Sequence, residues 1–319
     1  WEKLEAHVIE HLPQHLQYVP EGKLKIGLSL YGIQISVPKL NASGLTIKKA
    51  VKAAGRSVRI IPNKQLELNT AQVLHNQLTG PSGWELLFIR DGDTTVLAQT
   101  YALQDIEAYA ARDQARPKRD ARVGMLPPKL AQIIINLANP ADGATVLDPF
   151  CGTGVVLQEA LLMGYNTYGS DLESRMIEYT DANLDWLNIT SLARTTEQAD
   201  ATSHQWHTPF TTIAAETYLG RPFSSEPKPD VLREVMQDVD TIHRKFLKNV
   251  AKQTGPGFRM CIAVPAWKTR QGFQHLKTLD SLEELGYNRV SFVHPGDKPL
   301  IYHREGQIVG RELVVLVRK

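Results

Sequence analysis

The chain has 319 residues, of which 42% are hydrophobic and 22% are charged, and its formal net charge is +2. This composition is typical of a globular protein with a sizeable core, and it excludes a disordered or collagen-like chain. The length favours two domains. Because the net charge is small, a nucleic-acid partner would have to be bound by a local basic patch.

Two cysteines, Cys151 and Cys261, lie far apart in the sequence and have no metal-ligand companion at a useful spacing. They predict a reducing compartment, hence a cytoplasmic location, and no metal site. The sequence contains no run of 18 apolar residues and does not start like a signal peptide, so no membrane span is expected. The start at Trp1 rather than Met predicts that the numbered chain begins inside a longer one.

Residues 1–111 are predicted to form a small α+β domain without a catalytic constellation. The expected helices are a short one stopped by Pro13, one from Ser43 to Ala54, and one capped by Thr70. The expected strands cover 25–32 and 57–61, followed by a hairpin of 84–90 and 94–100 around an Asp-Gly turn.

Residues 112–129 are predicted to form a basic linker or collar, because prolines and a glycine interrupt any regular element there. Clustered cations on irregular backbone suit phosphate contact, which depends on counterion release rather than on base sequence. A solvated linker that is merely basic is the alternative. The cations predicted to contact RNA are Arg112, Arg116, Lys118, Arg119, Arg122 and Lys129.

Residues 130–319 alternate strands with helices, which predicts an α/β domain with a parallel sheet covered on both faces. The expected strands end near residues 147, 171, 198, 215 and 264, and an antiparallel pair near 289–293 and 308–317 closes the chain. The expected helices cover 130–138, 154–163, 173–187, 231–253 and 273–285. Ligands of such sheets bind beyond the carboxyl ends of the strands, which is where four acids fall: Asp148, Asp171, Asp200 and Glu216.

The segment Asp-Pro-Phe-Cys-Gly-Thr-Gly at 148–154 joins the first of these strands to a helix. Gly152 and Gly154 allow backbone amides to come close to a ligand. Asp171, 17 positions after Gly154, can accept the hydroxyls of a ribose. A nucleoside-bearing cofactor is therefore predicted.

The acid at the start of the loop indicates which nucleoside-bearing cofactor the chain binds. Asp148 would repel a pyrophosphate, and position 157, where a dinucleotide fingerprint would place a third glycine, is Leu. A carboxylate there can instead hold the positively charged end of S-adenosylmethionine (SAM). Asp200 can accept a hydrogen bond from the adenine amino group; the alternative is a loop carboxylate in water. The neighbours predicted to line the cofactor are Pro149, Phe150, Leu172 and Ala201.

The loop at 148–154 resembles the SAM-binding motif of Rossmann-type methyltransferases that modify exocyclic amino groups. The segments 116–120 (Arg-Pro-Lys-Arg-Asp) and 124–131 (Gly-Met-Leu-Pro-Pro-Lys-Leu-Ala) are similar to those preceding this motif in the THUMP-containing tRNA guanosine N2-methyltransferases of archaea and eukaryotes. Residues 26–32 and 57–59 resemble the RNA-binding THUMP domain of that family, and the similarity covers nearly the whole chain. The resemblance implies a Rossmann-like SAM-dependent methyltransferase domain behind a THUMP-like domain, with tRNA as the partner. It also places ribose binding on Asp171 and adenine binding on Asp200.

The resemblance is interrupted after the fourth strand. The family has Asp (or Asn)-Pro-Pro-Tyr (or Phe) there, whose carboxyl or amide oxygen and proline carbonyl accept the protons of the target amine while the ring stacks on the flipped base. Here the same place is Glu216-Thr217-Tyr218-Leu219. The resemblance implies that Glu216 and the Thr217 carbonyl orient the amine and that Tyr218 stacks on the base.

The sequence thus favours a SAM-dependent methyltransferase acting on the N2 of a tRNA guanosine. One alternative is a non-catalytic tRNA-binding protein in which the altered turn no longer works. Another is an amino-methyltransferase for DNA or protein, against which stand the THUMP-like strands and the basic collar. The tRNA species, the modified position, mono- versus dimethylation, the oligomeric state and a partner subunit stay open.

Overall fold

The computed structural model describes residues 1–120, 125–223, 227–296 and 298–319. The chain folds as two compact units, residues 1–108 and residues 109–319, here called the N-terminal and C-terminal units. Helix α4 (Ile106–Gln114) spans the division. Residues 112–129, predicted as a separate collar, therefore belong to the same unit as the large sheet described below.

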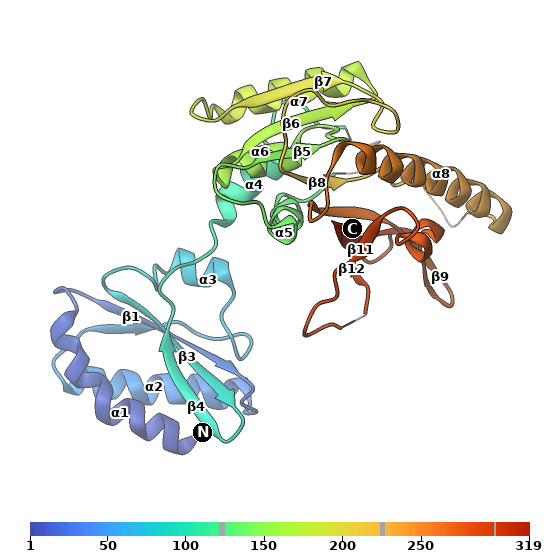
Figure 1. Cartoon of the computed structure of the whole chain (residues 1–319). Coiled ribbons are helices and arrows are strands. Elements are labelled where there is room, and N and C mark those ends of the chain that lie inside the picture. The colour runs from blue at the N-terminus through green and yellow to red at the C-terminus, as the bar shows by residue number, and fades with distance from the viewer. Residues whose placement is uncertain (121–124, 224–226, 297) are drawn as a thin grey trace. The chain divides into compact units, whose positions relative to one another are not determined.

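The N-terminal unit is an α+β unit built on a four-stranded sheet of order β2-β1-β3-β4 (Figure 1). The strands are β1 (Leu24–Tyr31), β2 (Val58–Ile60), β3 (Gly83–Asp91) and β4 (Thr94–Gln99). β1 pairs in parallel with β2 and β3, and β3 and β4 form the predicted antiparallel hairpin. Every second residue of β1 is apolar and buried, and these residues share one core with helices α1 (Glu2–His15) and α2 (Val37–Ala53).

The helices of this unit differ from the prediction at their ends. α2 begins at Val37 instead of Ser43, because the Ser36 hydroxyl accepts a hydrogen bond from the Lys39 amide and a proline lies in the first turn. Ser43 is buried inside that helix, where its hydroxyl donates to Glu5. α1 continues past Pro13 to His15, followed by a short 3₁₀ turn, η1 (Leu16–Tyr18). α3 (Thr70–His75) is capped by Asn69 rather than by Thr70, through a complete capping box.

The C-terminal unit is a Rossmann-like α/β fold. Its sheet has the order β11-β13-β9-β8-β5-β6-β7, with β10 and β12 added beside β9 and β13. Strands β5 to β9 are parallel, and β13 joins them antiparallel. Their bounds are β5 (Thr145–Asp148), β6 (Asn166–Asp171), β7 (Arg194–Gln198), β8 (Thr212–Glu216), β9 (Arg259–Thr269), β10 (Gly272–Gln274), β11 (Tyr287–Arg289), β12 (Leu300–Tyr302) and β13 (Val309–Arg318).

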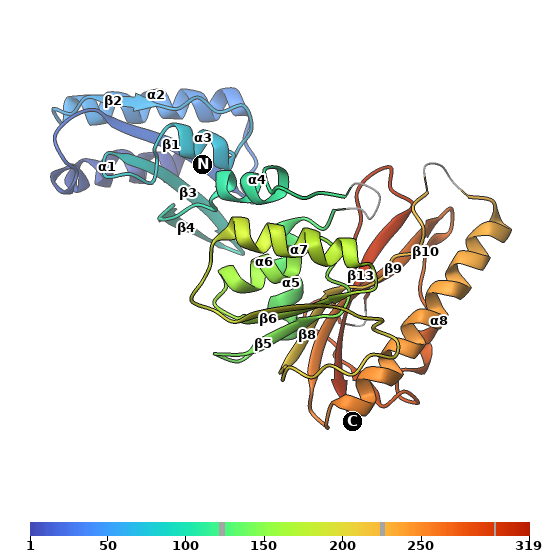
Figure 2. The ribbon, with the colours of Figure 1, turned by 90° about the horizontal axis from the view of Figure 1, so that it is seen from above.

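Helices cover this sheet on both faces, as predicted (Figure 2). Helices α5 (Pro128–Ala138), α6 (Val155–Leu162) and α7 (Ser174–Leu187) lie on one face, and the long α8 (Pro229–Gln253) lies on the other. Side chains of β5, β8 and β9 alternate between the two cores: Val146, Ala214 and Cys261 pack with α5, and their neighbours Leu147, Ile213 and Ile262 pack with α8. The site-bearing strands are therefore buried on both sides.

The helix predicted over 273–285 is wrong. The chain continues past β9 into β10, a short antiparallel strand, and then into the 3₁₀ helix η2 (Lys277–Ser281) and turns. Leu276, Leu282 and Leu285 are buried, and with the partly buried Leu279 they recur every three residues. A three-residue period places side chains in line on a 3₁₀ turn, whereas an α-helix would spread them around its axis.

Candidate functional site

The glycine loop between β5 and α6 packs tightly against α7. Gly152 and Gly154 both have positive φ, +53° and +81°, which other residues rarely adopt. A Cβ on Gly154 would lie 3.0 Å from both Cγ2 and Oγ1 of Thr180. The same hydroxyl donates a hydrogen bond of 2.9 Å to the Gly152 carbonyl, so α7 holds the loop from behind. The backbone conformation thus favours glycine at both positions, and the contact with Thr180 adds a steric reason at Gly154.

Asp148 and Asp171 lie at the carboxyl ends of the adjacent strands β5 and β6, the predicted place. Asp148 is 2% exposed and accepts a hydrogen bond of 3.1 Å from the Phe150 amide. Asp171 accepts from the amides of Gly152 (2.9 Å) and Glu173 (3.0 Å), one on each carboxylate oxygen. Asp171 therefore joins the end of its strand to the glycine loop, and the structure brings these predicted residues together.

The acids of this site crowd one another electrostatically. Burial raises the pKa of Asp148 well above its ordinary range, and the nearby Asp171 and Glu216 raise it further. Burial also raises the pKa of Asp171, against the hydrogen bonds from the amides of Glu173 and Gly152. A cation bound beside Asp148 would be favourable, because it would compensate the repulsion that this carboxylate meets from Asp171 and Glu216. The carboxylates of the site thus suit a positively charged ligand and would repel a phosphate.

The residues after β7 are arranged differently. Asp200 is exposed, and one of its oxygens accepts a hydrogen bond of 2.9 Å from the Thr202 amide. Ala201 is buried, and its carbonyl accepts a hydrogen bond from Asn249 of α8. Leu172, next to Asp171, is 66% exposed. These residues can supply a polar and an apolar contact for a flat ring.

The turn after β8 is tied to β13 by an ion pair that the sequence did not predict. Nε of Arg311 donates to Oε1 of Glu216, and the two side chains are 6% and 14% exposed. Burial raises the pKa of Glu216, and Arg311 opposes that rise. Within the described residues, no donor is bonded to the second oxygen of Glu216. The predicted acceptor is therefore half occupied rather than free.

The next two residues of this turn point in different directions. Thr217 is buried, and its hydroxyl lies 2.6 Å from Nε2 of His243 on α8. Burial lowers the pKa of His243 to about 4, so the ring is neutral near pH 7. Its Nδ1 lies 2.7 Å from the Val239 carbonyl and carries the proton there, which leaves Nε2 to accept from Thr217. Tyr218, by contrast, is 44% exposed and borders a shallow hollow of about 80 Å³ that Arg221 also lines.

The collar prediction needs correction at two of its six cations. Arg112 is 13% exposed, and its Nε donates to Glu159 of α6 over 2.6 Å. Arg116 is 3% exposed, and its guanidinium nitrogens have no hydrogen-bond partner among the described residues. Burial lowers the pKa of Arg116, and the nearby Asp113 opposes the shift. Both side chains are packed into the C-terminal unit, so neither presents a solvated cation to a phosphate.

The other predicted cations lie on the surface or outside the described part. Lys118, Arg119 and Lys129 are exposed, with the Lys118 ammonium 5.4 Å from the centre of the Tyr179 ring. Arg122 is outside the described residues.

Asn183 of α7 fastens this segment to the cofactor loop. Its side chain bonds both the amide and the carbonyl of Lys118, at 2.9 Å each, and donates to the Thr153 carbonyl at 2.8 Å. Residues 116–120 are therefore a strap held against the site.

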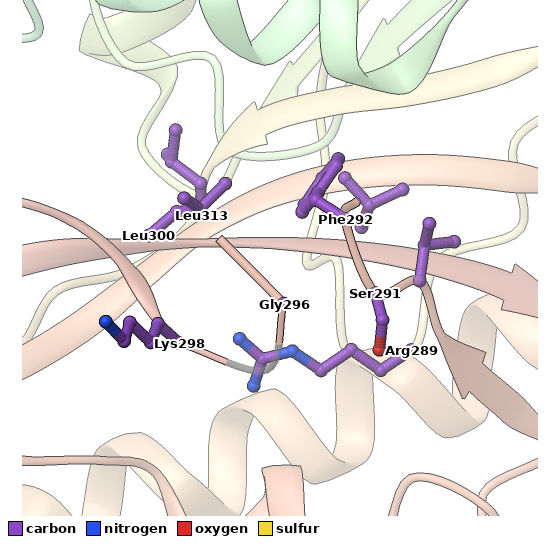
Figure 3. A pocket seen from close by; sticks show the side chains of 9 residues that line it. Arg289, Ser291, Phe292, Gly296, Lys298, Leu300 and Leu313 are labelled. Carbon is purple, nitrogen blue, oxygen red and sulfur yellow. The ribbon is translucent and has the colours of Figure 1, made fainter. Parts of the chain in front are cut away.

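Another hollow lies elsewhere on the sheet. It has a volume of about 130 Å³ beside β11 and β13, with Arg289 and Lys298 on one side and apolar side chains such as Phe292 and Leu313 on the other (Figure 3). It contains none of the predicted site residues.

The described ranges contain neither a membrane-spanning helix nor a metal-binding cluster. No helix in them is long and apolar enough to cross a membrane. They also hold no group of three or more His, Cys, Asp or Glu side chains that could bind a metal ion.

Comparison with known families identifies the C-terminal unit. The family of RMKL-like methyltransferase domains matches residues 116–288, more than half of the chain. The chain belongs to this family. Its cofactor is S-adenosylmethionine.

Two curated proteins that are similar to this chain carry the same name. The tRNA (guanine(10)-N2)-dimethyltransferase of Methanothermobacter thermautotrophicus is 31% identical over 175 residues, which are 54% of this chain and 48% of that protein. The enzyme of the same name from Methanocaldococcus jannaschii is 34% identical over 109 residues, 34% of this chain and 31% of that protein. The chain thus aligns with about half or less of the length of these relatives.

Among solved structures, TrmN from Thermus thermophilus aligns with 99% of this chain and 80% of its own, at 17% identity and a TM-score of 0.49. The likeness is too distant to bear on function.

Sequence reasoning missed Arg311, His243 and Asn183, which hold the predicted residues in place. One signal was available for Arg311. It interrupts, together with Glu312, an otherwise apolar strand that the pattern places inside the sheet, and a charged pair in such a strand needs partners. His243 and Asn183 lie on helices among other polar residues and have no comparable signal.

Proposed function

We propose that this methyltransferase transfers a methyl group from SAM to the N2 amine of a guanosine in tRNA. The observation that carries the proposal is a pair of strand-end acids, the buried Asp148 and the half-buried Asp171, around a positive-φ glycine loop within a methyltransferase family domain. The relatives named tRNA (guanine(10)-N2)-dimethyltransferase align with this same part of the chain and supply the substrate class. A dimethylated product is included in the proposal for the same reason.

Each residue at the strand ends contacts a different part of the cofactor. Asp171 accepts the ribose hydroxyls, and Asp148 compensates the positively charged end. Asp200 accepts from the adenine amino group, and the exposed Leu172 covers the ring. Gly152 and Gly154 bring the loop backbone close, with Pro149, Phe150 and Ala201 shaping the surrounding wall.

The turn after β8 positions the base. The bound cofactor supplies an electrophilic methyl group on a sulfonium. The free oxygen of Glu216 and the Thr217 carbonyl accept the two protons of the target amine, which directs the nitrogen lone pair along the line of attack. The exposed ring of Tyr218 stacks on the flipped guanine, an interaction worth about 1–3 kcal/mol for a base on an aromatic side chain.

The RNA is held outside the reacting atoms. We assign phosphate contact to the exposed Lys118, Arg119 and Lys129, together with Arg122. The N-terminal unit is proposed to be a THUMP-like module that binds the tRNA. Its support is a separate α+β fold that contains the predicted strand and hairpin. A cytoplasmic location is part of the same proposal, since Cys151 and Cys261 are buried free thiols.

The test is methyl transfer from labelled SAM to unmodified tRNA, with Glu216→Gln beside the wild type. We expect label in N2-methylated guanosine, found by nucleoside analysis, and at least a tenfold lower rate for Glu216→Gln because an amide nitrogen can replace the accepting oxygen. Protein that binds SAM in a calorimeter but labels no tRNA would contradict the proposed reaction. That outcome would favour a tRNA-binding role without catalysis.

A further inference from the structure

Arg311 and Glu216 meet across a strand that lies between their own. Glu216 ends β8, Arg311 lies in β13, and β9 separates the two strands. Alternation along each strand places both side chains on the face that packs with α5, the same face as Asp148. The β9 residues opposite them are Ala263 and Pro265, whose small side chains leave room for the long arginine to cross.

The contact with Arg311 leaves one carboxylate oxygen of Glu216 able to accept a further hydrogen bond. Arg311 binds one oxygen through Nε, and within the described residues no donor is bonded to the other. A guanidinium bonded through a single nitrogen at a buried site limits rotation of the carboxylate without using both oxygens. We propose that Arg311 is a positioning residue for methyl transfer, which turns the free oxygen of Glu216 toward the target amine. The inference rests on the proposed function and names a residue of that same site.

The backbone beneath this pair is already immobilised. The Thr217 amide and hydroxyl both lie 3.0 Å from the Ala263 carbonyl, the amide as a donor, and the hydroxyl proton is directed to the neutral His243 ring. These contacts hold a turn that has no proline to stiffen it. The backbone of the turn is therefore fixed, whereas the direction and the charge of the Glu216 side chain depend on its own contacts. Arg311 is the residue that acts on both.

The charge matters because the surrounding groups are acidic. Asp148 faces Glu216 from β5, Asp171 lies beyond it on β6, and Arg311 is the cation that faces Glu216 from β13. Burial raises the pKa of Glu216 and Arg311 lowers it, so loss of Arg311 raises the pKa further. A protonated Glu216 presents a hydrogen instead of a lone pair to the amine. Activity without Arg311 should then require a higher pH.

The experiment measures kcat against pH for Arg311→Met and Arg311→Lys in the full chain, with SAM binding by calorimetry as the test of folding. We expect Arg311→Met to lower kcat about tenfold or more at pH 7 and to shift the acidic limb of the profile to higher pH. Arg311→Lys keeps the positive charge, so the acidic limb of its pH profile should lie where it does in the wild type. Its kcat should recover only in part. Arg289→Met, which removes the arginine bonded to buried Glu312 at 2.7 Å, is the matched control and should leave the limb unchanged.

A second arm asks whether Arg311 acts through Glu216. Arg311→Met should cost little further activity in a Glu216→Gln background, because the positioned group is already altered. An equal loss in both backgrounds, or a loss independent of pH, would overturn the inference while leaving the methyltransferase active. A wild type that binds SAM but methylates no tRNA would instead be a failure of the proposed function.

Discussion

Replacement of Gly154 by Ala should destabilise the chain by about 2–4 kcal/mol and weaken SAM binding. The left-handed backbone at φ +81° costs a residue with a Cβ about 1–2 kcal/mol. The new methyl group would lie 3.0 Å from two atoms of Thr180, and overpacking of this kind costs about 1–3 kcal/mol. The lower entropy of the unfolded chain returns about 0.4–1 kcal/mol.

Gly164 provides a matched control in the same unit. Its φ is +89°, close to that of Gly154, but a Cβ there would have no atom within 4 Å. Gly164→Ala should therefore carry the backbone cost alone, about 1 kcal/mol. The difference between the two variants measures the contact with Thr180.

The measurement is urea unfolding of both variants and the wild type, with the SAM dissociation constant determined by calorimetry. We expect Gly154→Ala to be the less stable variant by about 1 kcal/mol or more. Its SAM affinity should fall about tenfold, since a shift of Thr180 releases the Gly152 carbonyl, whereas Gly164→Ala should bind SAM like the wild type. Adding Thr180→Ser to Gly154→Ala should recover part of both losses, because serine lacks the methyl group in contact. Equal stability of the two alanine variants would refute the reasoning.

Three further predictions follow from the site. Asp148→Asn should raise the thermal midpoint of the SAM-free chain near pH 7 and weaken SAM binding. Because the pKa of Asp148 is raised in the folded wild type, that protein loses stability as the pH rises above the ordinary carboxyl range. The higher midpoint of the variant should therefore vanish in thermal scans below about pH 4. Tyr218→Ala should lower kcat/KM for tRNA about 10–100-fold with an unchanged SAM dissociation constant, and an equal loss of SAM binding would argue against stacking. Asn183→Leu should cost about 2–4 kcal/mol in urea unfolding and raise the SAM dissociation constant, because it frees the strap and the Thr153 carbonyl. The buried Asn63 of the N-terminal unit, replaced in the same way, should cost stability without affecting SAM binding.

The grouping of the candidate cofactor residues was predictable because they are close in the sequence. Asp148 follows a short apolar strand, the glycines follow Asp148, and Asp171 ends the next strand. In a parallel sheet, adjacent strand ends meet at one edge, so chain order alone places these residues together. The alternation of strands and helices predicted the sheet for the same reason.

The elements that were mispredicted depended on competition between similar signals. Ser36 and Ser43 are both possible caps, and the proline after Ser36 favours the earlier one. The leucines of 276–285 suit a helix by composition, but their spacing and the hairpin from β9 into β10 produce a strand and 3₁₀ turns instead. Such choices rest on differences of about 1 kcal/mol, which local patterns resolve poorly.

The sequence by itself determined which strand ends carry the acids and where the glycine loop follows the first of them. Only the tertiary structure decided how those groups are held and which cations are available. Arg311 reaches Glu216 across 95 positions of sequence, and Arg116, one of six apparently similar cations, is buried while Lys118 is exposed. A residue's charge is written in the sequence, but its burial and its partner depend on segments brought together by the packing of distant strands and helices, which is a non-local property.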